Sequence, residues 1–168
     1  MVGAVAVTKQ LVIHPERCTA CRMCELACSF EHEGVFNPNR SRIKVEIFAE
    51  EAFYLPMACY HCDDYPCGQV CPTEAIIKDP NNRWITVVDN KCIGCKMCMQ
   101  ACPFGVMGFS AEVGVAQNCD LCGGNPQCVK FCSPNALEFL DVEETRHHKR
   151  SMFAAKVREA MKGEAAVL

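Results

Sequence analysis

The sequence predicts an α+β fold made of two similar modules related by a pseudo-twofold axis, followed by a helical tail. Three observations support this prediction. The chain has 16 cysteines among 168 residues, a density typical of a disulfide scaffold or a metal scaffold. These cysteines form four groups in which two spacing patterns alternate, which indicates an internal duplication. The segment after residue 140 has no cysteine and carries helix signals.

The thiols are expected to be reduced and available to metal. Residues 1–13 have no basic region and their short apolar run is interrupted by Thr8, Lys9 and Gln10, so they do not resemble a secretory signal peptide. We therefore expect a cytoplasmic protein. No membrane span is expected either, because no stretch approaches the roughly 18 apolar residues that a spanning helix needs. The formal charge of −3 counts the cysteines as neutral, so bound thiolates would make the chain more acidic and disfavour nucleic acid.

The sixteen cysteines divide into four groups of four, with none left over. In chain order, these groups are Cys18, Cys21, Cys24 and Cys28; Cys59, Cys62, Cys67 and Cys71; Cys92, Cys95, Cys98 and Cys102; and Cys119, Cys122, Cys128 and Cys132. The first and third groups share the spacing C-x2-C-x2-C-x3-C and align at an offset of 74 residues. The second and fourth groups have a longer middle gap, so a short-gap group is twice followed by a long-gap group.

Short strands are predicted between and around the groups. Lys44–Phe48 alternates apolar and polar residues, and Trp84–Val88 is rich in β-branched residues. The turn-forming residues Asp79–Asn82 precede the second of these strands and predict a hairpin. Leu11–Ile13 and Leu137–Leu140 are expected to be outer strands that flank the first and last groups.

The cysteine-free segment from Asp141 to Gly163 is predicted to be a helix. Asp141 and Glu144 form a D-x-x-E cap pattern, and Gly163 can end the helix. The apolar stripe of this helix consists of Phe153, Val157 and Met161. Its basic stretch runs from Arg146 to Arg150. We expect this tail to dock on a partner protein, and packing against its own domain is the alternative.

The cysteine spacing favours [4Fe–4S] clusters over zinc. A cubane presents irons at several corners, so three cysteines within seven residues, as in Cys18 to Cys24, can each reach a different iron. Structural zinc more often takes two cysteines from each of two distant knuckles. C-x2-C-x2-C-x3-C followed by Pro103 is the bacterial ferredoxin run, in which the fourth cysteine ligates the other cluster of a pair. The second and fourth groups alone could be zinc knuckles, and His61 could ligate iron although its group already has four thiols.

No catalytic motif accompanies the cysteines. The sequence has no G-x-S-x-G, no phosphate-binding loop and no dinucleotide-binding fingerprint. We therefore expect a chain that is not an enzyme by itself and that conducts electrons for a partner. A structural zinc-binding adaptor is the alternative from a different functional class.

All sixteen cysteines, over residues 10–140, resemble those of the four-cluster ferredoxin-like subunits of molybdenum and tungsten oxidoreductases, the group typified by dimethyl sulfoxide reductase and formate dehydrogenase. The chain is most similar to the small subunit that accompanies tungsten-containing aldehyde oxidoreductases. The resemblance implies two ferredoxin-like modules, four [4Fe–4S] clusters and a catalytic partner with a molybdenum or tungsten cofactor, with a flavin-containing subunit or a soluble redox protein as a second partner. A partner of carbon monoxide dehydrogenase or hydrogenase, and a free polyferredoxin, remain alternatives.

The resemblance also implies which cysteines share a cluster and how the chain divides. The fourth cysteine of each group would cross to another group, which gives the sets Cys18, Cys21, Cys24 and Cys132; Cys119, Cys122, Cys128 and Cys28; Cys59, Cys62, Cys67 and Cys102; and Cys92, Cys95, Cys98 and Cys71. The cluster domain would cover residues 1–140, with an inner module at about 57–110, an outer module from 10–30 and 115–140, and the tail at 141–168. Cys28 and Cys132 are followed by serine instead of proline, so the outer module departs from the ferredoxin run at positions that are not ligands.

Overall fold

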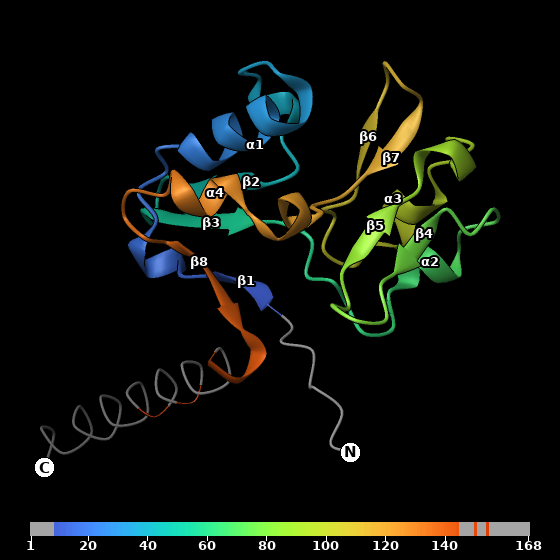
Figure 1. Cartoon of the computed structure of the whole chain (residues 1–168). Helices are drawn as coiled ribbons and strands as arrows, with labels where there is room; N and C mark the ends of the chain where they lie inside the picture. The colour runs from blue at the N-terminus through green and yellow to red at the C-terminus, as the bar shows by residue number, and fades with distance from the viewer. Residues whose placement is uncertain (1–8, 145–149, 151–153, 155–168) are drawn as a thin grey trace, which may run out of the picture.

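Short helices, short strands and the loops between them form two lobes in the computed structural model, which describes residues 9–144, 150 and 154 (Figure 1). The outer lobe contains β1 (Lys9–Ile13), α1 (Met23–Glu33), β2 (Lys44–Phe48), β3 (Phe53–Met57), α4 (Gln127–Lys130) and β8 (Leu137–Asp141). The inner lobe contains α2 (Pro66–Gln69), β4 (Ile76–Lys78), β5 (Ile85–Val87), α3 (Met97–Ala101), β6 (Gly108–Ser110) and β7 (Val115–Gln117). The outer lobe is thus built from both ends of the described chain and the inner lobe from its middle.

The strands form four two-stranded antiparallel sheets, β1 with β8, β2 with β3, β4 with β5, and β6 with β7. The predicted α+β class is therefore confirmed, whereas the pseudo-twofold axis stays a prediction. The predicted strand at Lys44–Phe48 is β2, and the strand predicted at Trp84–Val88 is the shorter β5. The hairpin turn before β5 is held by Asp79, whose Oδ1 accepts hydrogen bonds from the backbone N–H groups of Asn81 and Asn82 at 2.7 and 3.2 Å.

The two predicted outer strands pair with each other and close the outer lobe. β1 runs antiparallel to β8, with Leu11 opposite Phe139 and Ile13 opposite Leu137. Trp84 of the inner lobe reaches this sheet, because its ring nitrogen donates to the Lys9 carbonyl at 2.9 Å and its ring lies 6.1 Å from that of Phe139. The sheet therefore joins the two ends of the described chain and also contacts the inner lobe.

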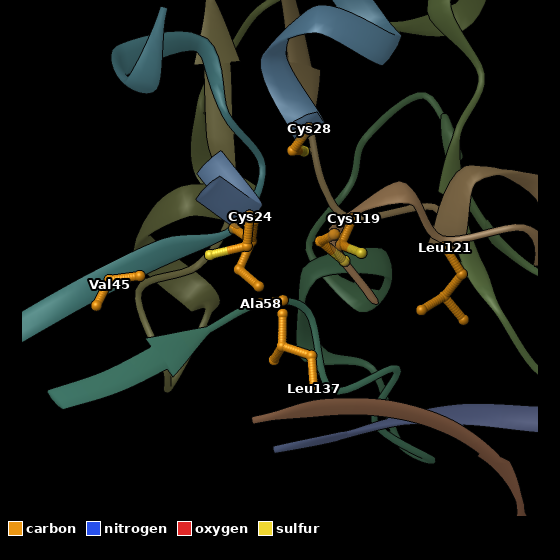
Figure 2. Close-up of a cluster of buried hydrophobic side chains, with 9 residues drawn as sticks. Cys24, Cys28, Val45, Ala58, Cys119, Leu121 and Leu137 are labelled. Atoms are coloured by element: carbon orange, nitrogen blue, oxygen red, sulfur yellow. The ribbon is translucent and has the colours of Figure 1, made fainter. Parts of the chain in front are cut away.

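Each lobe has its own buried core, and cysteines are part of both. In the outer core, Ile43, Leu121 and Leu137 are each at most 2% exposed, and Figure 2 shows Leu137 close to Ala58 in the same core as Cys24, Cys28 and Cys119. In the inner core, Ile76, Ile85, Met107 and Ala116 surround Cys67 and Cys98. Because thiols occupy so many core positions, we expect bound metal to contribute much of the stability of both lobes.

The predicted duplication is visible in the backbone conformation. Arg22 and Lys96, which are 74 residues apart, have φ values of 58° and 63° and stand directly before α1 and α3. Ala20 and Gly94, at the same offset, have φ values of 55° and 69°. A left-handed conformation is uncommon for residues other than glycine, so its recurrence at equivalent positions indicates that the two cysteine loops follow the same path.

Several elements were not predicted from the sequence. The helices α1 to α4 all begin within cysteine groups, and α2, α3 and α4 have only four or five residues each. Left-handed residues such as Arg22 directly before a helix further obscure any helical periodicity. At the start of the predicted tail helix, Asp141 Oδ1 accepts a hydrogen bond from the Glu144 backbone N–H at 2.8 Å, and the tail as a whole stays a prediction. The apolar stripe and nearly all of the basic stretch of the tail lie outside the described residues. No helix in the described part of the chain has the length and apolarity to cross a membrane.

Candidate metal-binding cysteines

All sixteen predicted ligands lie in the described part of the chain, and none of them forms a disulfide there. The third cysteine of each group is buried and lies on a helix, namely Cys24 on α1, Cys67 on α2, Cys98 on α3 and Cys128 on α4. Only two of the sixteen, Cys21 and Cys95, are exposed, and they occupy equivalent positions in the first and third groups. Cys28 and Cys119 are also buried. The third cysteine of each group is used below as the reference point from which the neighbours of that group are described.

Cys24 has a neighbour from the far end of the described chain. Burial, together with the negative charges of Glu25, Cys132 and Cys18, raises the pKa of Cys24 to about 12. The contribution of Cys132 requires the first and last cysteine groups to lie close together. The packing of α1 against α4 brings them there.

Cys128 lies among thiols of both its own group and the first group. Burial raises the pKa of Cys128, and the charges of Cys119, Cys28 and Cys122 act in the same direction. A weaker contribution comes from Cys24, so the surroundings of Cys24 and Cys128 adjoin each other.

In the inner lobe, Cys67 has neighbours from the second and third groups. Burial raises the pKa of Cys67 to about 11, with further contributions from the charges of Cys59 and Cys102. Cys102 belongs to the third group and comes close because α2 packs against α3. The structure thus places the fourth cysteine of the third group beside the second group.

Cys98 and Cys119 complete the arrangement. Burial raises the pKa of Cys98, as do the charges of Cys92 and Cys95 of its own group. Burial, together with the charges of Cys28 and Cys59, raises the pKa of Cys119 to about 12. The Cys59 contribution shows that the fourth group of the outer lobe lies next to the second group of the inner lobe.

Backbone N–H groups point to several of the sulfur atoms. Ala75 donates to Cys71 at 3.3 Å and Ala136 donates to Cys132 at 3.2 Å, each from four residues further along the chain. Longer-range donors reach Cys28 from Arg42, at 3.3 Å, and Cys92 from Ala116, at 3.5 Å. Hydrogen bonds of this kind stabilise thiolate ligands and help to set the reduction potentials of iron–sulfur clusters.

Two buried nitrogen atoms among the described residues have no hydrogen-bond partner, Arg42 Nε and His61 Nε2. His61 Nδ1 accepts a hydrogen bond from the Ile85 backbone N–H at 2.8 Å, so in the neutral ring Nε2 carries the hydrogen. Burial lowers the pKa of His61 to about 4, which favours that neutral ring. Both unpartnered atoms are therefore N–H donors in residues next to cysteines, as expected if the cysteine sites hold a group rich in sulfur acceptors.

A polar cluster that was not predicted from the sequence adjoins Cys28 and Cys122. His32 Nε2 lies 3.8 Å from Cys122 Sγ and 3.4 Å from Asp120 Oδ1. Arg42 pairs with the other oxygen of Asp120 at 2.8 Å. No spacing rule connects these residues, since His32 and Cys122 are 90 positions apart and meet only through the packing of α1 on α4.

Residues 50–142 match the family described as "4Fe-4S dicluster domain". The chain belongs to this family. A polyferredoxin-like subunit of aliphatic sulfonate oxidoreductase from Pyrococcus furiosus is 45% identical over 133 residues, which are 79% of this chain and 76% of that protein. A thiosulfate reductase electron transfer subunit from Salmonella typhi is 35% identical over 80% of this chain and 77% of its own length. The Escherichia coli protein named "Probable anaerobic dimethyl sulfoxide reductase chain YnfG" is 35% identical over 84% of this chain and 78% of its own length.

These comparisons confirm the predicted resemblance and the predicted type of cofactor. The chain is an iron–sulfur electron-transfer subunit of the kind found in oxidoreductase complexes, and it carries [4Fe–4S] clusters. The thiols present fit this cofactor, because all sixteen are free and the groups that donate to their sulfurs lie close by.

Proposed function

We propose that the chain binds four [4Fe–4S] clusters on four mixed cysteine sets and transfers electrons to or from a separate catalytic subunit. Each set is named here after its member that is the third cysteine of a group. The Cys24 set is Cys18, Cys21, Cys24 and Cys132; the Cys128 set is Cys28, Cys119, Cys122 and Cys128; the Cys67 set is Cys59, Cys62, Cys67 and Cys102; and the Cys98 set is Cys71, Cys92, Cys95 and Cys98.

One observation carries this assignment. In three of the sets, the charge neighbours of the buried thiol include the fourth cysteine of a different group: Cys132 beside Cys24, Cys28 beside Cys128, and Cys102 beside Cys67. The fourth set follows because Cys71 is the remaining thiol and follows α2, which packs against the α3 helix that bears Cys98.

The neighbour relations between sets support a single row. The Cys24 set adjoins the Cys128 set through Cys24 and Cys128, and the Cys128 set adjoins the Cys67 set through Cys119 and Cys59. The Cys67 and Cys98 sets adjoin through α2 and α3. The two exposed cysteines, Cys21 and Cys95, then belong to the first and last sets of the row, and we propose that redox partners approach the chain at these two ends.

The chain contributes the environment of the clusters. When bound, [4Fe–4S] clusters supply one-electron redox centres whose potentials depend on hydrogen bonds, charge and exposure. Burial of at least one thiol in each set limits access of water, and backbone donors such as Ala75 and Arg42 fix the sulfur positions. Substrate chemistry would take place on another chain, with this one setting position and potential.

The proposed catalytic partner is a cytoplasmic subunit with a tungsten or molybdenum cofactor, such as an aldehyde oxidoreductase. The relatives support a partner of this broad type, because they are named as subunits of sulfonate, dimethyl sulfoxide and thiosulfate oxidoreductases. The second partner would be a flavin-containing subunit or a soluble redox protein. A partner of carbon monoxide dehydrogenase or hydrogenase, and a free polyferredoxin, are the competing functions.

Anaerobic purification of the native complex tests the proposal. The chain should contain about sixteen irons and about sixteen acid-labile sulfides, and should co-purify with a chain that contains tungsten or molybdenum. A variant that ends at Glu144 serves as the matched comparison, since it removes the tail but none of the cysteines. It should keep the iron and the visible spectrum and lose the co-purifying chain.

Three results would contradict parts of this proposal. Zinc as the main metal would exclude electron transfer. About twelve irons would exclude four complete cubanes. Loss of iron from the variant that ends at Glu144 would show that the tail belongs to the cluster domain and is not a docking element.

A further inference from the structure

The Cys28 thiol has surroundings that distinguish it from the other deeply buried thiols. Cys24, Cys28 and Cys128 are all between 5% and 7% exposed, and burial alone would raise the pKa of each of them. Cys28 accepts a hydrogen bond from the Arg42 backbone N–H at 3.3 Å, and His32 lies four residues further along α1. The space around this sulfur is therefore arranged to favour negative charge.

His32 stands between two sulfur atoms that come from distant parts of the chain. It follows Cys28 by one helical turn on α1 and hydrogen-bonds to that thiol, while its Nε2 lies 3.8 Å from Cys122 Sγ. Its side chain is 11% exposed. Cys28 and Cys122 belong to the same proposed set, so the imidazole contacts two of the four sulfurs of one set.

Two further residues fix the orientation of the ring. Asp120 Oδ1 lies 3.4 Å from His32 Nε2, and a carboxylate can only accept, which requires Nε2 to carry a hydrogen. Asp120 is itself held by Arg42 at 2.8 Å and accepts the Cys122 backbone N–H at 2.9 Å.

We propose that His32 is a positioning residue whose Nε2–H donates a hydrogen bond to Cys122 Sγ in the Cys128 set. This hydrogen bond raises the reduction potential of the cluster bound there above that of an otherwise identical site without the donor. This inference rests on the proposed assignment of Cys28, Cys119, Cys122 and Cys128 to one cluster. One-electron reduction adds one negative charge next to these sulfurs without breaking or forming a covalent bond. An N–H donor and a nearby guanidinium stabilise that added charge.

The cluster of His32, Asp120 and Cys122 has an alternative interpretation as a mononuclear metal site, since one ligand atom from each residue lies within 4.8 Å of the others. The contacts of Asp120 favour the donor role. Its two oxygens are already engaged by Arg42 and by the Cys122 backbone, and a cation at this place would lie next to the Arg42 guanidinium.

The test is a set of variants of the full chain in which all four reduction potentials are measured by redox titration with electron paramagnetic resonance. His32→Leu keeps the side-chain volume similar and removes the donor. We expect the iron and sulfide content to stay at the wild-type level. One reduction potential should fall by about 59 mV, which corresponds to a tenfold change in the equilibrium constant of a one-electron couple. His32→Gln retains an amide donor and should recover part of that shift.

The matched control is Glu31→Gln, on the same helix next to His32. Glu31 is exposed, so removing its charge should leave all four potentials unchanged. The potential that shifts in His32→Leu must belong to the signal that is lost when Cys28 is replaced by alanine.

Several outcomes would overturn the inference. Unchanged potentials in His32→Leu would show that the ring does not act on the cluster. Loss of about four irons in both His32 variants would show that His32 is a ligand or is required to build the site. Stoichiometric zinc bound by His32 beside four intact clusters would favour the mononuclear site. A wild-type chain without [4Fe–4S] signals would instead contradict the proposed function itself, so the two failures are distinguishable.

Discussion

The loops of the first and third cysteine groups have the same backbone conformation, but the fourth cysteines of these two groups have different surroundings. Cys28 in the outer lobe receives hydrogen bonds from His32, Ser41 and the Arg42 backbone. Cys102 is its counterpart 74 residues later, and among the described residues no side chain of the inner lobe forms a comparable polar cluster beside it. The residue four positions after Cys28 is His32, whereas the residue four positions after Cys102 is Val106.

A second pair of equivalent positions shows the same contrast. Glu25 is 1% exposed, pairs with Arg22 at 2.6 Å and accepts the Val45 backbone N–H at 2.8 Å. Its counterpart Met99 is 36% exposed. In the outer lobe, the buried carboxylate of Glu25 thus connects α1 to the β2–β3 hairpin. The inner lobe has no insertion of comparable length at the equivalent place in its sequence. The duplicated scaffold keeps the ligands in place while the polar surroundings diverge, and these surroundings are what can give otherwise similar clusters different potentials.

The largest effect should come from removing a crossing cysteine from each lobe. We expect Cys28→Ala to damage the cluster held by Cys119, Cys122 and Cys128 and to spare the one held by the Cys24 set. Cys102→Ala should damage the cluster of the Cys67 set and spare that of the Cys98 set. Each variant should lose about four irons, or fewer if a three-iron cluster remains.

Matched variants identify which cluster is lost. Cys122→Ala should remove the same electron paramagnetic resonance signal as Cys28→Ala, and Cys21→Ala should remove a different one. If Cys28→Ala and Cys21→Ala remove the same signal, the crossing assignment is wrong and the first and fourth cysteine groups of the outer lobe do not exchange their fourth cysteines.

The sequence allowed the ligands and part of the fold to be predicted because both depend on local patterns. Cysteine spacing identified all sixteen candidate ligands, and β2 and the β4–β5 hairpin followed from alternation and from the turn at Asp79. β6 and β7 were missed because three residues in each strand are too few to show alternation. The cluster of His32, Arg42 and Asp120 was missed because it forms only when α1, α4 and the loop before β2 meet in space.

A smaller effect should come from the loop that precedes the second cysteine of the short-gap groups. Gly94 has φ = 69°, and an added Cβ would lie 2.7 Å from the Gly114 carbonyl oxygen in the β6–β7 turn. Gly94→Ala should therefore destabilise the inner lobe by about 2 to 4 kcal/mol, from the left-handed conformation and from the clash with backbone. The outer-lobe counterpart is already alanine, at φ = 55°, so Ala20→Gly should change stability by less than about 1 kcal/mol.

Thermal unfolding of the cluster-loaded protein, followed anaerobically through the visible absorbance, compares these two variants. Gly94→Ala should lower the unfolding temperature and Ala20→Gly should leave it nearly unchanged. Equal effects of the two substitutions would mean that the β6–β7 turn does not distinguish the lobes in the way the structure indicates.

The smallest effect concerns the ion pairs that close the outer lobe. Glu138 on β8 pairs with Arg17 at 3.0 Å and with His14 at 3.3 Å, which links the residues after β1 to the last strand. Lys91, the counterpart of Arg17 in the inner lobe, forms no ion pair within the described part of the chain. Because Glu138 and Arg17 are partly exposed, Glu138→Gln should lower the free energy of unfolding by less than about 1 kcal/mol, and Lys91→Gln should have no measurable effect.

The dependence on pH follows from the direction of the shift at Glu138. Partial burial acts to raise its pKa, but Arg17 and His14 outweigh burial and hold the pKa below the ordinary glutamate value. A carboxylate with a lowered pKa in the folded state contributes stability above its unfolded pKa of about 4.3 and loses it as the pH falls through the folded value. The deficit of Glu138→Gln should therefore be constant between about pH 5.5 and pH 8 and should shrink in high salt, which screens exposed pairs. Anaerobic thermal unfolding of wild type, Glu138→Gln and Lys91→Gln across this pH range, at low and high salt, measures both dependences. A deficit that high salt leaves unchanged would show that packing of the side chain and not its charge holds β1 and β8 together.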